Sequence, residues 1–284
     1  ASAKEAIETY RTASELTPDS VVRLQKLGMM SYYMGERATA TRVLSRAAML
    51  GLDSKLFDCQ SLVLLTFAYF ADNDRKGIER CMADFARLLE RHENTDSPRI
   101  LRFVEVSRTL QLIQQRQFSQ AVEAVKTMAN EINARSFDFE AACNLGSLLA
   151  VLTTTSIDLS EGAVWIRSLG MRYANTRGLC ELMANACNIF PPYSESIREC
   201  LLEINKTAEK AMARSLSGDA TGAVRSLLRH GAQTLNTKLV DLSQQVLLRH
   251  RDRDRIEESD ALQQEIDALR ERCGVAPTKA VLGQ

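Results

Sequence analysis

The sequence predicts an all-α protein built from antiparallel helix hairpins, and three observations support this prediction. Only 5 prolines and 13 glycines occur in 284 residues, fewer than the usual shares of about 5% and 7%. Few residues therefore interrupt a helix. Apolar residues recur at helical spacing, and the amino-terminal part repeats itself at a fixed interval.

The charge and hydropathy of the chain exclude two classes of partner. Lysine plus arginine and aspartate plus glutamate number 36 each, which argues against nucleic-acid binding through bulk positive charge and against a polybasic membrane anchor. The longest apolar run, Ser61 to Ala71, is far shorter than the roughly 20 residues of a membrane span. We expect it to be a buried helix, and we expect neither nucleic acid nor membrane as a partner.

The cysteines indicate a reducing compartment, most simply the cytoplasm. Their number is odd, and no two form a CxxC pair, so a disulfide framework is not indicated. Each is expected to act as a small buried hydrophobe. The seven are Cys59, Cys81, Cys143, Cys180, Cys187, Cys200 and Cys273.

The repeat interval near the amino end is 34 residues, and it is carried by small and large apolar positions. Ala6, Tyr10 and Ala13 map onto Ala40, Leu44 and Ala47. Pro18 closes the first set. A helix is predicted over Val21 to Met34, Gly35 breaks it, and a second helix begins near Ala38.

Two further hairpins are predicted from their breaks. The first spans roughly Leu56 to Leu89 and is interrupted by Asp72-Asn73-Asp74. The next opens at Ser97-Pro98, an N-cap residue followed by proline at the first helical position. It turns near Arg116-Gln117.

A fourth hairpin has Asn144-Leu145-Gly146 in its first helix and Ala163 in its second, with the polar turn TTTSIDLSEG between them. Ala174 to Pro192 is expected to form a single helix that ends at its two prolines.

A fifth hairpin is expected to begin at Ser196, because Glu199 three residues later completes a capping-box pattern. It turns at Gly218-Asp219. The predicted helical domain covers residues 1–250, and residues 251–284 form a capping helix and a flexible tail.

The carboxy-terminal helix is predicted from Ile256 to Arg272, after the segment RHRDRDR, which we expect to be a solvated loop. Leu262, Ile266 and Leu269 share one of its faces. We expect this face to cover the end of the last hairpin. The alternative is a short coiled coil that would make a homodimer.

Counted from Val21 as position 1, positions 4, 7, 8, 15, 20, 24 and 27 hold Leu24, Leu27, Gly28, Gly35, Ala40, Leu44 and Ala47. In this pattern of small and large apolar residues the chain resembles the tetratricopeptide repeat family. Leu52 stands where the family has proline, and later repeats match less closely, with irregular spacing. The resemblance implies a right-handed α-solenoid whose first helices line a concave groove.

Carried over position by position, the resemblance implies a partner-binding groove, with a peptide or helix of another protein as the ligand. Its residues would be Val22, Gln25, Met29, Tyr32, Tyr33, Leu62, Thr66, Tyr69, Phe70, Phe103, Val106, Leu110 and Ile113. Tyrosine and methionine suit such a surface because they give adaptable contact area.

Some co-chaperones of this family clamp a carboxylate with lysines and asparagines at groove positions. Here these positions hold Val22, Gln25, Met29 and Tyr33. The groove is therefore expected to bind an apolar segment or a helix rather than an acidic tail.

Signs of catalysis are few. His92, His230 and His250 are the only histidines, and none stands at metal-ligand spacing from another histidine or a cysteine. We expect His92 and His250 to be solvated or to cap helix ends. Phosphate-binding and nucleophile-elbow motifs are absent from the sequence. No enzyme activity, cofactor or metal is therefore expected.

The function expected from these features is that of a non-catalytic scaffold for protein interactions. A sensor or output module of a signalling regulator, fused for instance to a receiver domain, is the alternative. A helical-scaffold enzyme comes third. Because the chain starts inside what would be the second helix of a repeat, we expect a further portion upstream.

Overall fold

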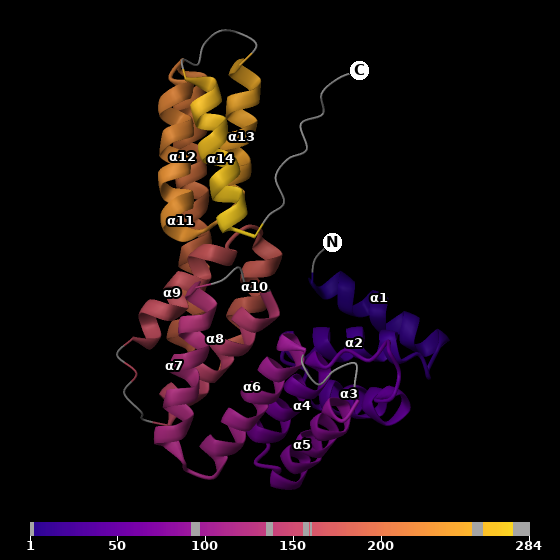
Figure 1. Cartoon of the computed structure of the whole chain (residues 1–284). Helices are drawn as coiled ribbons and strands as arrows, with labels where there is room; N and C mark the ends of the chain where they lie inside the picture. Colours follow the sequence, from indigo (N-terminus) through magenta and orange to yellow (C-terminus); the bar gives the residue numbers. More distant parts are fainter. Residues whose placement is uncertain are drawn as a thin grey trace. The chain divides into compact units, whose positions relative to one another are not determined.

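The computed structural model describes residues 3–91, 97–134, 139–155, 159, 161–251 and 258–274. Across these ranges the regular structure consists of fourteen α-helices, with no strand among them (Figure 1). The predicted all-α class is confirmed.

The helices follow one another with short connections. Their bounds are α1 Ala3–Leu16, α2 Val21–Tyr33, α3 Arg37–Gly51, α4 Gln60–Ala71, α5 Arg75–Leu89, α6 Pro98–Gln114, α7 Phe118–Ala134, α8 Phe139–Thr154, α9 Gly162–Tyr173, α10 Arg177–Ala186, α11 Pro191–Leu216, α12 Ala220–Thr234, α13 Thr237–Arg251 and α14 Ser259–Arg272.

Two compact units divide the chain. Unit 1 comprises Ala1–Glu131, Glu140–Leu159 and Asn185–Phe190, and unit 2 comprises Ile132–Phe139, Ser160–Ala184 and Pro191–Gln284. In unit 1 each helix from α1 to α5 packs against the next, and in unit 2 the same holds from α11 to α14. Packing in sequence order is the arrangement expected of a solenoid-like array of hairpins. None of the described helices combines the length and the apolar character of a membrane span.

Local sequence explains where several hairpins turn. Gly35 ends α2 with φ of +80°, a backbone conformation that favours glycine. Asp74 caps α5 by accepting a hydrogen bond from the Gly77 backbone N–H at 2.9 Å, and Asp219 caps α12 in the same way through Gly222 at 2.8 Å. The breaks predicted at Gly35, Asp72-Asn73-Asp74 and Gly218-Asp219 are confirmed.

Two boundaries differ from the prediction. The helix expected to reach Pro192 ends at Ala186, and Pro191 and Pro192 begin α11 instead of closing a helix. Proline suits a first helical turn because its missing N–H has no partner there. Ser196 consequently lies inside α11 and does not start it.

A helix was missed near the carboxyl end. Leu235 ends α12 in the left-handed conformation with φ of 51°. The side chain of Asn236 then accepts a hydrogen bond from the Leu239 N–H at 3.2 Å and so opens α13. Glycine and asparagine are the residues that usually adopt this conformation, so a leucine in the sequence does not indicate that a helix ends there.

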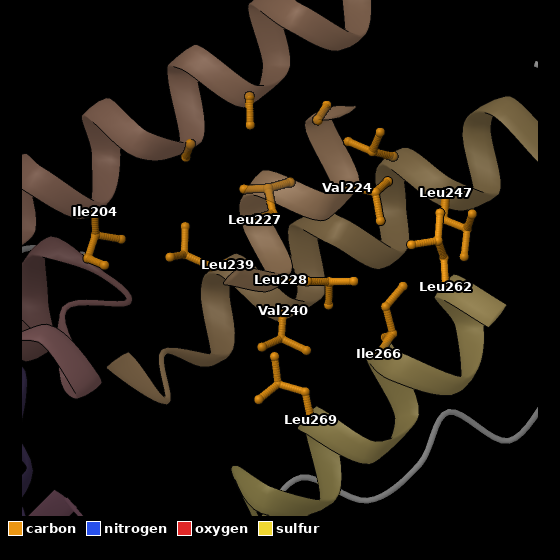
Figure 2. Packing of buried hydrophobic residues seen from close by; sticks show 14 of the residues in the cluster. Ile204, Val224, Leu227, Leu228, Leu239, Val240, Leu247, Leu262, Ile266 and Leu269 are labelled. Carbon is orange, nitrogen blue, oxygen red and sulfur yellow. The ribbon is translucent and has the colours of Figure 1, made fainter. Parts of the chain in front are cut away.

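The core of unit 2 confirms the capping helix. Leu262, Ile266 and Leu269 of α14 are at most 5% exposed, and they point towards apolar side chains of α12 and α13 (Figure 2). The helix starts at Ser259 rather than Ile256. The apolar face that a coiled-coil dimer would need is thus covered within the unit.

The histidine interpretation needs one correction. His250 is 5% exposed, and its Nε2 lies 3.0 Å from the Ser215 hydroxyl, so it is buried rather than solvated. His92, residues 252–257 of the RHRDRDR region, residues 156–158 and 160 of the polar turn and the tail Val275–Gln284 lie outside the described residues.

Gly28 allows α2 and α3 to approach closely. A Cβ atom built there would lie 2.5 Å from side-chain carbons of Leu44, which is fully buried. We expect Gly28→Ala to lower the free energy of unfolding by roughly 1 to 3 kcal/mol through overpacking. Urea unfolding followed by circular dichroism measures this. Gly178→Ala is the control, since nothing lies within 4 Å of that position; equal stability of the two variants contradicts the expectation.

Candidate functional site

From Gln60 to Ala68, helix α4 is buried on every side within unit 1. All nine residues from Gln60 to Ala68 are buried, and α2, α3, α5 and α6 pack around the helix. Leu62 and Thr66, two of the expected groove residues, are 0% exposed. This face of the array is therefore interior rather than an open surface.

Hydrogen bonds satisfy the polar side chains around α4. The Gln25 amide in α2 donates to the Asp58 carbonyl at 3.1 Å and to the Ser61 hydroxyl at 3.0 Å. Thr66 shares a hydroxyl contact of 3.2 Å with Ser107 in α6. Gln25 and Thr66, expected to face a partner, instead join first helices of successive hairpins.

A pair of side-chain hydrogen bonds joins helix α8 to α4. The amides of Gln60 and Asn144 exchange two hydrogen bonds, both 3.0 Å long, and every residue of α8 from Ala142 to Leu152 is buried. Arg99 strengthens this attachment, because it lies 3.2 Å from Asp58 and 2.6 Å from Glu140 at the start of α8. The chain's own helix thus occupies space that an open groove would leave to a partner.

The expected groove residues fall into three groups by exposure. The buried ones are Gln25, Met29, Tyr33, Leu62, Thr66, Phe103, Val106, Leu110 and Ile113. Tyr32, Tyr69 and Phe70 are partly exposed, and Val22 is 41% exposed. The Tyr69 hydroxyl lies 2.9 Å from that of Ser45. Of these residues, Tyr32 and Phe70 line the same cavity.

That cavity, which we call the aromatic pocket, lies within unit 1 and has a volume of about 350 Å³. It is lined by Tyr32, Gly35, Arg37, Phe67, Phe70, Ala71, Ser147, Val151, Asn185, Ala186, Asn188 and Ile189. Cavities of roughly 300 to 1,000 Å³ are typical of ligand sites.

Aromatic rings form one part of the lining of the aromatic pocket. The Tyr32 ring meets those of Tyr33 and Phe67, with centroids 5.6 and 6.5 Å apart. Burial raises the pKa of Tyr32 well above its ordinary value, so its phenol stays neutral at physiological pH.

The polar groups of the aromatic pocket are mostly engaged. The Ser147 hydroxyl donates to the Ala186 carbonyl at 2.9 Å, and Arg37 pairs with Asp72 at 3.1 Å. The side-chain amides of Asn185 and Asn188 add donors and acceptors to the lining. No sequence signal marks these asparagines, because they lie at the end of a short helix outside the repeat pattern and belong to unit 1 only through tertiary packing.

Cysteine chemistry does not point to catalysis. Burial raises the pKa of Cys81 and Cys187 to about 12 and that of Cys180 and Cys200 to about 11. These thiols are protonated at neutral pH and are therefore weak nucleophiles. Within the described ranges, no group of three or more histidine, cysteine, aspartate or glutamate side chains could hold a metal ion.

No protein-family model matches the chain, and no curated protein matches it significantly. The aromatic pocket is therefore interpreted from its own chemistry.

The Gln60–Asn144 amide pair gives a test of how α8 is attached. Asn144→Leu leaves the buried Gln60 amide without its partner, and we expect it to lower the free energy of unfolding by about 1 to 3 kcal/mol. The double variant Gln60→Met/Asn144→Leu should recover most of this loss, because both polar groups are then gone. Urea unfolding of Gln60→Met, Asn144→Leu and the double variant measures the coupling between the two amides. If the loss in the double variant equals the sum of the two single losses, the two amides are not coupled and the expectation is wrong.

Burial also predicts how the thiols react. Cys273 is half-buried, whereas the other six cysteines are buried. In the native protein a thiol reagent such as iodoacetamide should label Cys273 first, and the others only at the rate of unfolding. Mass spectrometry of peptides over a time course measures the order. Rapid labelling of Cys187 in the folded chain contradicts its assigned burial.

Proposed function

We propose that this chain is a non-catalytic protein-interaction module that binds a partner peptide or helix in the aromatic pocket. The pocket's apolar lining carries the proposal: Tyr32, Phe67 and Phe70 surround a cavity next to exposed Ile189. Such a cavity suits a large apolar anchor residue, since buried anchors supply most of the affinity in peptide recognition.

The polar groups suit a segment of protein better than an isolated hydrocarbon. Asn185 and Asn188 each offer an amide donor and acceptor beside the apolar walls. A bound peptide carries backbone N–H and C=O groups that need such partners once they leave water. The anchor would enter the pocket while its backbone meets the asparagines.

Membership of the tetratricopeptide family and a cytoplasmic location belong to the same proposal. The close approach of Gly28 to Leu44 and the succession of packed hairpins support the first. The seven free cysteines support a reducing compartment.

Peptide selection tests the proposal. Peptides enriched from a random displayed library against the native protein should share a large apolar or aromatic residue. Ile189→Asp and Tyr32→Ala should each weaken binding of an enriched peptide roughly tenfold or more. The first variant places a negative charge at the pocket, and the second removes an aromatic ring from its lining. Fluorescence anisotropy of the labelled peptide gives the affinities.

Leu16→Asp is the matched control, because Leu16 is an exposed leucine of unit 1 that does not line the pocket. It should leave the affinity unchanged, and circular dichroism verifies that all three variants fold. Enriched peptides that bind Ile189→Asp and Tyr32→Ala as tightly as the native protein would refute the assigned site.

A further inference from the structure

Unit 2 contains a second cavity of different chemistry, which we call the donor pocket. Its volume is about 400 Å³. It is lined by Asn175, Thr176, Arg177, Cys180, Glu181, Arg198, Leu201, Leu202, Asn205 and Lys238. The lining contains three cationic side chains and one carboxylate, so it carries a surplus of positive charge although the whole chain has no net charge.

Local structure gathers these residues from three helices. Arg198, Leu201, Leu202 and Asn205 lie on one face of α11, at the spacing of successive helical turns. Lys238 lies in the first turn of α13. Residues 175–181 come from the start of α10 and the turn before it.

The acceptors of the donor pocket are already bound to donors of the chain. Lys238 donates from its ammonium to Asn205 Oδ1 at 2.6 Å and from its backbone N–H to Asn175 Oδ1 at 3.3 Å. Because ammonium and backbone N–H groups only donate, both contacts require the oxygen of the asparagine. The NH₂ group of each asparagine is therefore left as a donor.

The remaining acceptors follow the same pattern. The Glu181 carboxylate accepts from Arg198 Nε at 3.2 Å, and the Thr176 hydroxyl accepts from the Leu179 N–H at 3.2 Å. The Cys180 thiol donates to the Ile197 carbonyl at 3.3 Å. Arg177, the Arg198 guanidinium NH₂ groups and the rest of the Lys238 ammonium remain as charged donors.

We propose that the donor pocket binds an acidic peptide segment. A cavity with a surplus of charged donors is complementary to carboxylate oxygens, which accept without donating. The exposed side chain of Leu202, 68% exposed beside Leu201, adds an apolar contact that a peptide uses and a free inorganic anion does not. The ligand is thus a segment that contains both acidic residues and leucine-like residues.

Binding of a defined probe to the full chain tests this. The probe is a fluorescein-labelled peptide Leu-Glu-Asp-Leu-Glu-Glu, measured by anisotropy, and the comparison peptide is Leu-Gln-Asn-Leu-Gln-Gln. The acidic peptide should bind more tightly, and added sodium chloride should weaken it by screening. Inorganic phosphate should compete only weakly, because it makes no contact with Leu202.

Four variants at three positions localise the site. Arg177→Gln and Lys238→Gln should each weaken the acidic peptide roughly tenfold, the effect of losing one charge-assisted contact. Lys238→Arg keeps the charge and should retain most of the affinity. Leu202→Ser should weaken the peptide without changing phosphate binding.

Arg229→Gln in α12 is the matched control, because it removes the same charge from unit 2 outside the donor pocket. Circular dichroism verifies folding. The proposal is overturned if Arg229→Gln weakens binding as much as Arg177→Gln, if the uncharged peptide binds equally well, or if phosphate binds and the acidic peptide does not. None of these residues lines the aromatic pocket, so failure here leaves the proposed function separately testable.

Discussion

The burial of α4 on every side is the constraint on which the rest of unit 1 depends. A helix without a solvent-facing side must satisfy each of its polar side chains internally. Gln60 is satisfied by α8, Ser61 by α2 and Thr66 by α6 together with its own helix. Each of these bonds fixes the position of a different helix relative to α4, so a few polar contacts set the arrangement of an otherwise apolar core.

This constraint also determines where a ligand has room. In an open array the first helices of successive hairpins face solvent, but here α8 is hydrogen-bonded to α4, and residues of both helices line the aromatic pocket. Unit 2 is built differently, because small and branched apolar side chains of α12, α13 and α14 pack together in one continuous core. The cavities of the two units differ in their side chains: aromatic rings line the one in unit 1, and three cationic side chains line the one in unit 2.

The sequence predicted the elements better than the site, for a physical reason. Helical periodicity and turn residues such as Gly35 and Asp74 act over a few neighbours, so the hairpins up to α7 were predicted nearly at their bounds. The assignment of groove residues assumed that first helices stay uncovered. Gln60 and Asn144 stand 84 residues apart, and no local pattern says that they pair. The left-handed conformation of Leu235 was missed because a leucine rarely adopts it.

Hydrogen–deuterium exchange resolved to single amides tests the central claim, that α8 is part of the unit 1 core, most directly. If it is, the amides from Ala142 to Leu152 should open with the same free energy as those of α4, within about 1 kcal/mol, because both are released by one unfolding event. Much faster exchange of α8, with α4 still protected, would contradict the claim and would mean that the face of α4 is open to partners.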